Sequence, residues 1–391
     1  MLRLSPRPSS RCIAIVLLIG FQLVHVRQVF SQQVPAQQTE SKPEVRPITD
    51  DGQPAKEKKP EPKQNGSSDD AAKSTVQESE DSKTSENQKP NDDQTPAEPK
   101  PKKAAPIKVG DAFIAPPKND PNFQLMGEFV GELVDPSSEG KKQFMGLQLR
   151  PLAGDRFQAI VYGGGLPGDE EFGGKKFKLI GMRSDETLVL SGGPWAVFVS
   201  PEGCTLINAK GEMLGQLKRI KRISPTLGAK PPEGATVLFD GSDVEQFVNG
   251  QISERGLLQQ GALISPMFQD FDLHLEFRLP YMPDADGQKR GNSGLYLQSR
   301  YECQILDSFG TDRVFDGLGA LYRLKKPDLN MAFPPLVWQT YDVRFTAPRW
   351  AASGKKIRNA HITSWVNGVK VQDDVSLPTK TGNGQQESPT L

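Results

Sequence analysis

Residues 271–307 read FDLHLEFRLPYMPDADGQKRGNSGLYLQSRYECQILD, and the pattern within this stretch decides the fold. Apolar and polar side chains alternate strictly from Leu273 to Leu279, which is the period of a strand with one buried face. The alternation returns in residues 294–298 and again in residues 301–305. Short alternating runs joined by loops predict an all-β domain that carries polar side chains on one face of a sheet.

The polar positions of these runs hold charged and amide side chains. Glu276 and Arg278 share one side of the first run, and Glu302 and Gln304 share one side of the third. If these strands are neighbours, the four side chains form a single polar patch. Such a patch is either a solvated surface or a groove for a polar ligand.

Acidic and basic residues balance along the 391-residue chain. Lys plus Arg and Asp plus Glu both number 48, so the formal net charge is zero. The balance gives no electrostatic reason to expect a nucleic-acid partner or an anionic membrane surface.

The N-terminus has the features of an export signal. Three arginines lie within the first eleven residues, and residues 13–26 are largely apolar. Small residues before Gln32 suit a signal peptidase, so we predict that residues 1–31 are a signal peptide and that the protein is periplasmic or secreted. A retained membrane anchor is the alternative, but the apolar run is shorter than the roughly 20 residues that span a bilayer. No membrane partner is expected after cleavage.

Three further ranges follow the signal. Residues 32–108 are rich in Lys, Glu, Pro, Gln and Ser and poor in large apolar side chains, so we predict a disordered linker. Residues 109–226 show short alternating runs and turn signals, which predict a small β barrel or sandwich without an assignable role. Its glycine-rich loop, residues 163–169, lacks the Lys-Ser/Thr ending of a phosphate-binding loop.

Residues 233–391 predict a second β unit. Many short strand patterns without a helical period favour a two-sheet sandwich, and an Asn367-Gly368 pair predicts a tight hairpin. From Asp373 onward no strand pattern is evident. The two cysteines of the mature chain, Cys204 and Cys303, do not form a disulfide framework. No spacing of His, Cys, Asp or Glu demands a metal, and no cofactor is expected.

The second unit resembles the 3-keto-disaccharide hydrolase domain family. The pieces that carry the resemblance are LFDGSD, DFDLHLEFR, GNSGLYLQSRYECQILD, GALY, VWQTYDVRF and WVNGVKV, in the family's order. The resemblance implies a concanavalin-like jelly roll that acts on sugars whose C3 hydroxyl is oxidised to a ketone. It also implies further C-terminal strands with a Leu-Gln-Asp-His-Gly segment, so we expect this sandwich to be incomplete at its C-terminus and to leave an unpaired edge.

The implied reaction assigns roles to the polar residues. A ketone at C3 acidifies the C2 proton, so a base can remove it while donors stabilise the enolate. Glu302 is the first-choice acid/base, because burial beside a second carboxylate raises a carboxyl pKa. The other catalytic candidates are Asp307, as the alternative base, and Glu276. The candidates for contacts to the sugar are Arg278, Asn292, Ser293, Gln304, Tyr322 and Trp338.

Simpler interpretations stand beside these roles. The first is a surface ion network formed by Glu276, Arg278 and Glu302. In the second interpretation, Asp307 only caps the next turn. In the third, Trp338 belongs to the core. A carbohydrate-binding module without catalysis is the main alternative function, and a non-catalytic scaffold is the third.

Overall fold

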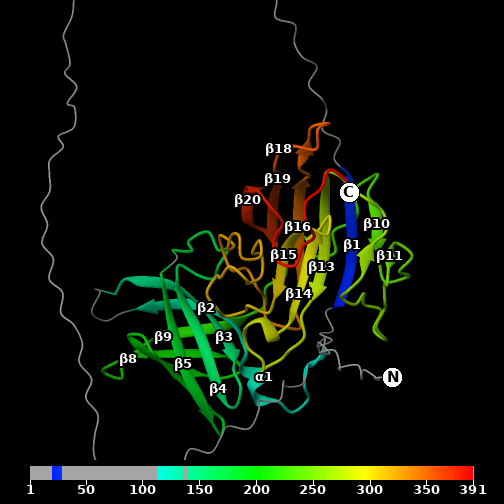
Figure 1. Cartoon of the computed structure of the whole chain (residues 1–391). Helices are drawn as coiled ribbons and strands as arrows, with labels where there is room; N and C mark the ends of the chain where they lie inside the picture. The colour runs from blue at the N-terminus through cyan, green and yellow to red at the C-terminus, as the bar shows by residue number, and fades with distance from the viewer. Residues whose placement is uncertain (1–19, 29–111, 135–139, 174, 391) are drawn as a thin grey trace, which may run out of the picture. The chain divides into compact units, whose positions relative to one another are not determined.

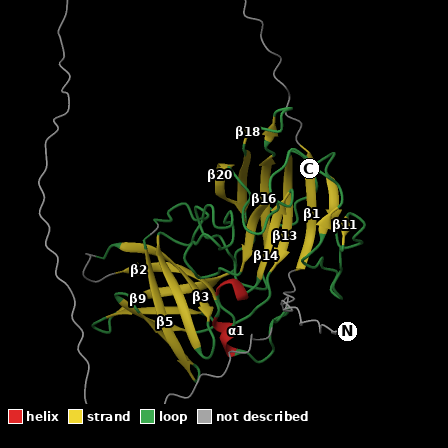
Figure 2. Ribbon diagram, in the orientation of Figure 1, coloured by secondary structure: helices red, strands yellow, loops and turns green. Residues whose placement is uncertain are grey.

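The computed structural model of the chain describes residues 20–28, 112–134, 140–173 and 175–390 (Figure 1). Nearly all regular structure in these ranges is strand; the helical exceptions there are α1 (Pro121–Leu125) and the one-turn η2 (Gly287–Lys289) (Figure 2). The predicted all-β class is therefore confirmed. The linker predicted for residues 32–108 lies outside the described residues.

Eight antiparallel strands of the first unit form a closed barrel. They pair in chain order, and the last strand returns to the first. Their bounds are β2 (Gly127–Val134), β3 (Lys142–Pro151), β4 (Arg156–Gly163), β5 (Lys176–Ser184), β6 (Thr187–Ser191), β7 (Trp195–Val199), β8 (Gly203–Asn208) and β9 (Met213–Ile220). Closure pairs every strand on both sides, which removes the exposed edges that a flat sheet would have.

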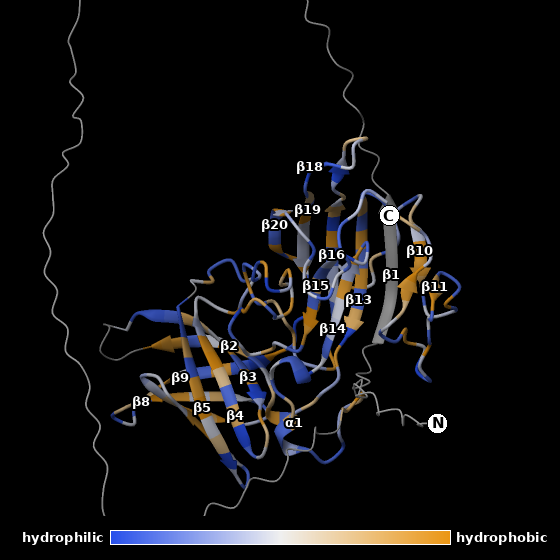
Figure 3. Ribbon diagram, in the orientation of Figure 1, coloured by the Kyte–Doolittle hydropathy of each residue, from blue (hydrophilic) through white to orange (hydrophobic). Residues whose placement is uncertain are grey.

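The barrel interior follows from the alternation in the sequence. Met145, Leu147 and Leu149 of β3 point into one apolar core, and the same period recurs on the other strands (Figure 3). The glycine-rich loop packs on the outside, where the Leu166 side chain is fully buried. A Cβ at Gly146 would lie 2.6 Å from the Gly165 backbone, so this close approach requires glycine.

The second unit is built on a six-stranded antiparallel sheet of order β10-β1-β13-β16-β19-β20. The bounds are β1 (Gly20–Gln28), β10 (Thr236–Phe239), β13 (Phe271–Arg278), β16 (Trp338–Thr346), β19 (Ala360–Val366) and β20 (Val369–Leu377). A separate ribbon, β14 (Asn292–Leu297) with β15 (Tyr301–Leu306), supplies the facing layer. The small ribbons are β11 (Phe247–Val248) with β12 (Leu263–Ile264), and β17 (Arg349–Trp350) with β18 (Lys356–Arg358).

The six-stranded sheet and the β14–β15 ribbon bury a common core. Leu275 and Phe277 of β13 belong to the same apolar cluster as Tyr301, Cys303 and Ile305 of β15. Side chains alternate across a strand. The polar residues of β13 and those of β15 therefore point away from this core in opposite directions.

The Asn367-Gly368 hairpin forms as predicted. Both residues have positive φ, 51° and 78°, as a two-residue hairpin turn of this type requires. The second strand of the hairpin runs further than the sequence suggested, because β20 continues through Asp373 to Leu377. Irregular pairing between β19 and β20 explains the weak pattern, since bulges interrupt the alternation.

Cys204 and Cys303 lie in different cores. Cys204 is buried in the barrel and Cys303 in the sandwich, and both thiols are free. Burial raises the pKa of each thiol to about 12.

Strand β1 lies inside the segment predicted to be an export signal. It pairs with β10 on one side and with β13 on the other, so β13 has a partner along both edges. The pairing does not test export, and the signal peptide remains a prediction. Over the described ranges, no helix has the length and apolar character needed to cross a bilayer.

Removal of residues 1–31 should destabilise the sandwich, because it leaves the facing edges of β10 and β13 unpaired. We expect the thermal midpoint to fall by more than about 4 °C, a shift that roughly 1–2 kcal/mol produces in domains of this size. A chain that starts at Gly20 retains β1 and serves as the matched control. Equal midpoints for the two chains in a calorimetric scan would show that β1 contributes nothing to stability.

Candidate active site

The four polar residues predicted to form one patch lie on two faces of the sandwich. Glu276 and Arg278 project from β13, whereas Glu302 and Gln304 project from the opposite side of the shared core on β15. The expectation of a single polar patch is therefore wrong. Alternation reveals which side chains share a face of a strand, but not which sheet the strand joins.

Glu302 lies at the centre of one polar cluster. Its relative exposure is 8%, and its pairing partner across the ribbon is Tyr296 of β14. Burial raises the pKa of the Glu302 carboxyl, while hydrogen bonds from the Tyr296 hydroxyl and the Asn383 backbone N–H act against that rise. Burial and the nearby carboxylate raise the pKa of Tyr296 well above its usual value. The Tyr296 phenol therefore keeps its proton and donates it in a hydrogen bond to the Glu302 carboxylate.

Gln304 extends the cluster along β15. Its Nε2 donates to Gln288 Oε1 at 3.0 Å and to Asn292 Oδ1 at 3.3 Å. Asn292 in turn donates to the Gln288 carbonyl at 2.8 Å. Gln304 is only 1% exposed, and its Oε1 accepts no hydrogen bond from the described residues. Buried amide oxygens are normally paired, so this atom can accept a donor from a hydroxyl or a water.

The C-terminal strap, residues 378–390, lies across this cluster. Thr381 Oγ1 accepts from the Glu302 backbone N–H at 2.6 Å, and the Thr381 N–H donates to the Arg300 carbonyl at 3.0 Å. The Gln385 N–H donates to the Ser299 carbonyl at 2.8 Å. The strap therefore follows the end of the ribbon and covers the Glu302 carboxylate.

Charged and glycine residues fix the strap in place. Glu387 accepts from Lys356 Nζ at 2.6 Å and from the Tyr301 hydroxyl. A Cβ at Gly382 would overlap the Glu302 carboxylate, because the strap backbone lies directly on that side chain. Only glycine permits so close an approach.

Asp307 has a structural partner. Its Oδ2 accepts from Arg290 Nε at 2.7 Å, and both side chains are almost fully buried. Arg290 also donates to the Pro151 carbonyl of the barrel at 3.1 Å. Asp307 Oδ1 accepts from the Phe309 N–H at 3.3 Å, as expected for the cap of the following turn. These contacts favour a structural role over the proposed base.

The remaining predicted residues of β13 and its neighbours lie away from Glu302. The Arg278 guanidinium sits over the Trp338 ring at 5.2 Å, on the outer face of the six-stranded sheet. Glu276 accepts from the Gly228 backbone N–H on the same face. No ion pair joins Glu276, Arg278 and Glu302 in the part of the chain that the structure describes, so the predicted surface network does not form there.

Of the last two candidates, Tyr322 lies in the Glu302 cluster and Ser293 does not. Ser293 pairs with Ile305 and lies on the core side of β14, so it does not face the cluster. The Tyr322 N–H donates to the Glu302 carbonyl at 3.1 Å, and the Tyr322 ring carries Arg323 above it at 5.3 Å. Tyr322 is close enough to raise the pKa of Tyr296. It therefore belongs to the Glu302 cluster.

Sequence reasoning missed four members of this cluster: Tyr296, Gln288, Thr381 and Asn383. Tyr296 lies at a polar-face position of residues 294–298, so its side was readable from the alternation. Gln288 lies in the one-turn η2, and Thr381 and Asn383 lie in the strap, where no period indicates the direction of a side chain. Across the described ranges, no group of three or more His, Cys, Asp or Glu side chains is placed to hold a metal ion.

One family model matches the range of the sandwich. Residues 234–390 match the model of the 3-keto-alpha-glucoside-1,2-lyase-like domain, which confirms the resemblance over this range. A solved structure described as a "putative glycosyl hydrolase" from Parabacteroides distasonis ATCC 8503 is similar at 26% identity. That similarity covers 39% of this chain and 72% of the other, with a TM-score of 0.36. No curated protein matches the chain.

Asp307→Asn should lower the stability of the protein far more than the loss of an exposed ion pair does. It leaves the Arg290 charge buried and unpaired, which costs about 3–5 kcal/mol. Glu132→Gln breaks the exposed pair with Lys142 and serves as the control, with an expected cost below about 1 kcal/mol. Denaturant unfolding measures both. Similar small losses would return Asp307 to the list of candidate bases.

Gly382→Ala should displace the strap from Glu302, because the new methyl group overlaps the carboxylate. We expect amide hydrogen exchange across residues 381–385 to accelerate by at least about tenfold. Gly354→Ala is the matched control, since Gly354 also has positive φ, +79°, but open space around its Cβ position. Unchanged exchange in Gly382→Ala would mean that the strap does not lie on Glu302 in solution.

Proposed function

We propose that the sandwich domain cleaves 3-keto-glycosides and that Glu302 is its acid/base. The observation that carries this proposal is a buried carboxyl with a raised pKa, bonded to a phenol, within a range that matches a 3-keto-alpha-glucoside-1,2-lyase-like domain. A carboxyl whose pKa is raised in this way can serve as an acid or a base.

The chemistry begins with the acidic proton on C2 of the sugar. The Glu302 carboxylate removes that proton, and the C2–H electron pair forms the enolate of the C3 ketone. The enolate then expels the C1 substituent: the C1–O bond breaks, and its electrons and a proton go to the leaving oxygen. Addition of water across the new double bond gives net hydrolysis. An acid is therefore needed beside the base.

Neighbouring side chains suit the other tasks. The Tyr296 hydroxyl donates to Glu302, so it can relay a proton to or from that carboxyl. Gln304 Oε1, which accepts no hydrogen bond from the part of the chain that the structure describes, and the Asn292 amide can hold sugar hydroxyls. Tyr322 offers an aromatic edge near the same carboxyl. The strap must move for a substrate to reach Glu302, because its backbone lies on the side chain.

An oxidised glycoside is accordingly the partner we propose, in the periplasm or outside the cell. This location follows from the predicted signal peptide in residues 1–31. Fusion of the full N-terminal segment to a reporter that is active only after export would test it.

Glu302→Gln should abolish most turnover of a 3-keto-disaccharide. Loss of a general base costs about 10²-fold or more in kcat, and the amide preserves the shape of the side chain. In the native protein, kcat should rise with pH through the raised pKa of Glu302, since only the deprotonated form accepts the C2 proton. Chromatographic loss of substrate measures both.

A Glu276→Gln variant tests whether the reaction takes place at Glu302, because Glu276 lies on the other side of the core. We expect its kcat to stay within about threefold of the native value. A loss in this variant and none in Glu302→Gln would move the site to β13. Saturable binding of the substrate with no turnover by the native chain would favour a carbohydrate-binding module.

A further inference from the structure

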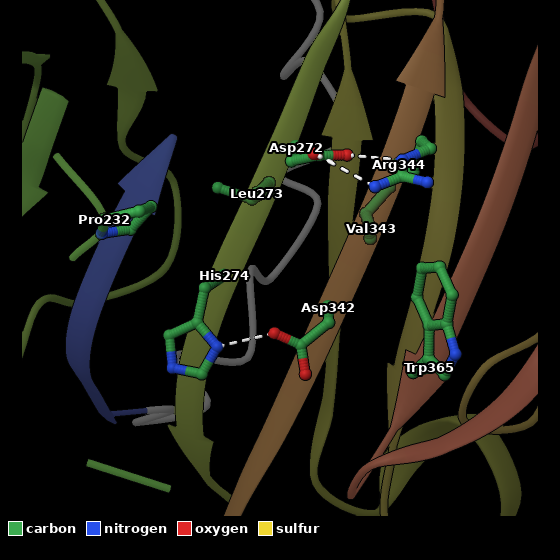
Figure 4. Close-up of a pocket in the computed structure, with 8 residues that line it drawn as sticks. All are labelled: Pro232, Asp272, Leu273, His274, Asp342, Val343, Arg344 and Trp365. Atoms are coloured by element: carbon green, nitrogen blue, oxygen red, sulfur yellow. Dashed lines mark hydrogen bonds and ion pairs between the residues drawn. The ribbon is translucent and has the colours of Figure 1, made fainter. Parts of the chain in front are cut away.

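The outer face of the six-stranded sheet carries a hollow that is separate from Glu302. Its volume is about 260 Å³, and it lies over β13, β16 and β19 (Figure 4). The residues that line it and enter the argument are Pro232, Asp272, His274, Asp342, Arg344 and Trp365. The shared core lies between this face and the polar face of β15, so the two sites do not overlap.

Paired polar side chains on neighbouring strands form the floor of the hollow. His274 Nδ1 and Asp342 Oδ1 are 2.6 Å apart, and Arg344 donates to both carboxylate oxygens of Asp272, at 2.9 and 3.3 Å. Burial lowers the pKa of His274, but the hydrogen bonds and charges of Asp342 and Glu276 together outweigh burial, so the net shift is upward. These contacts fix each donor and acceptor before any ligand arrives.

The connection between the two units forms one wall. Thr226 Oγ1 donates to Asp342 Oδ2 at 2.9 Å, and Ser224 Oγ lies 2.6 Å from Thr340 Oγ1. The Gly228 N–H donates to Glu276 on the same face. These hydrogen bonds hold residues 224–228 against the sheet, and Pro232 closes one side of the hollow.

An indole forms the opposite side. Trp365 of β19 is the pairing partner of Asp342, and its ring stands half-buried beside Asp342 and Arg344 (Figure 4). A flat aromatic face next to fixed donors and acceptors is suited to a ring that has an apolar face and polar edges.

We propose that this hollow binds one pyranose ring of a neutral glycan. The ring stacks on Trp365, and its hydroxyls bond to Asp342, Arg344 and Asp272. The volume is below the roughly 300–1,000 Å³ of pockets for drug-sized ligands, so it takes a single ring and not a longer chain.

The charge of the site selects a neutral ligand. Asp272 is paired with the Arg344 guanidinium, and Asp342 and Glu276 both contact the His274 imidazole. The carboxylates disfavour a phosphate, and within the described ranges no group of three or more His, Cys, Asp or Glu side chains is placed to hold a metal ion. A polyol both donates and accepts hydrogen bonds, so it matches the mixture.

Saturation-transfer NMR on the full-length chain tests the site with unoxidised methyl glucoside, galactoside, mannoside and xyloside as probes. We expect saturable binding of at least one glycoside. Trp365→Ala should weaken it at least about tenfold, whereas Trp365→Phe retains an aromatic face and should bind within about threefold of the native chain. Asp342→Asn, which keeps the shape of the side chain, should also weaken binding about tenfold.

Variants of the Glu302 cluster separate this site from the proposed reaction. Glu302→Gln should bind the methyl glycosides as the native chain does, and Trp365→Ala should keep its native kcat on a 3-keto-disaccharide. Absence of saturable binding by all four glycosides overturns the proposal. Equal binding by native protein and Trp365→Ala does so as well, and loss of binding in Glu302→Gln would place the glycoside in the other site.

Discussion

The apolar layer shared by β13 and the β14–β15 ribbon is the constraint on which the rest of the sandwich depends. Leu275 and Phe277 meet Cys303 and Ile305 there, and burial of such side chains is the main favourable term in folding. Because side chains alternate along each strand, this contact also fixes where the polar residues point. It gives the domain two polar faces with different neighbours and different chemistry.

One of these faces is closed and the other is open. The strap covers Glu302 and removes water from the carboxyl, which favours its protonated form and raises its pKa. The outer face of the six-stranded sheet keeps its carboxylates in pairs with His274 and Arg344 and leaves a hollow beside them. The same fold thus offers a buried site that suits proton transfer and an accessible site that suits recognition.

The sequence predicted the class of fold and the strands well, since period-two alternation is a local property. It also identified Glu302, Gln304, Asn292 and Tyr322, which the structure brings together. Two features escaped it. The assignment of β13 and β15 to different layers depends on long-range pairing, and the position of the strap over Glu302 depends on loop glycines with no period. Asp307 was read as a candidate base, because nothing in its neighbourhood along the chain points to Arg290, seventeen residues earlier.

Among the described residues, the free thiols of Cys204 and Cys303 can report separately on the two units. Cys204 sits in the barrel core and Cys303 in the sandwich core, so each is shielded from reagents while its own unit is folded. Their raised pKa values keep them protonated and slow to oxidise. A thiol-specific label will therefore react at Cys204 when the barrel opens and at Cys303 when the sandwich opens. Peptide mapping of the label can then show whether the two units melt together or one after the other.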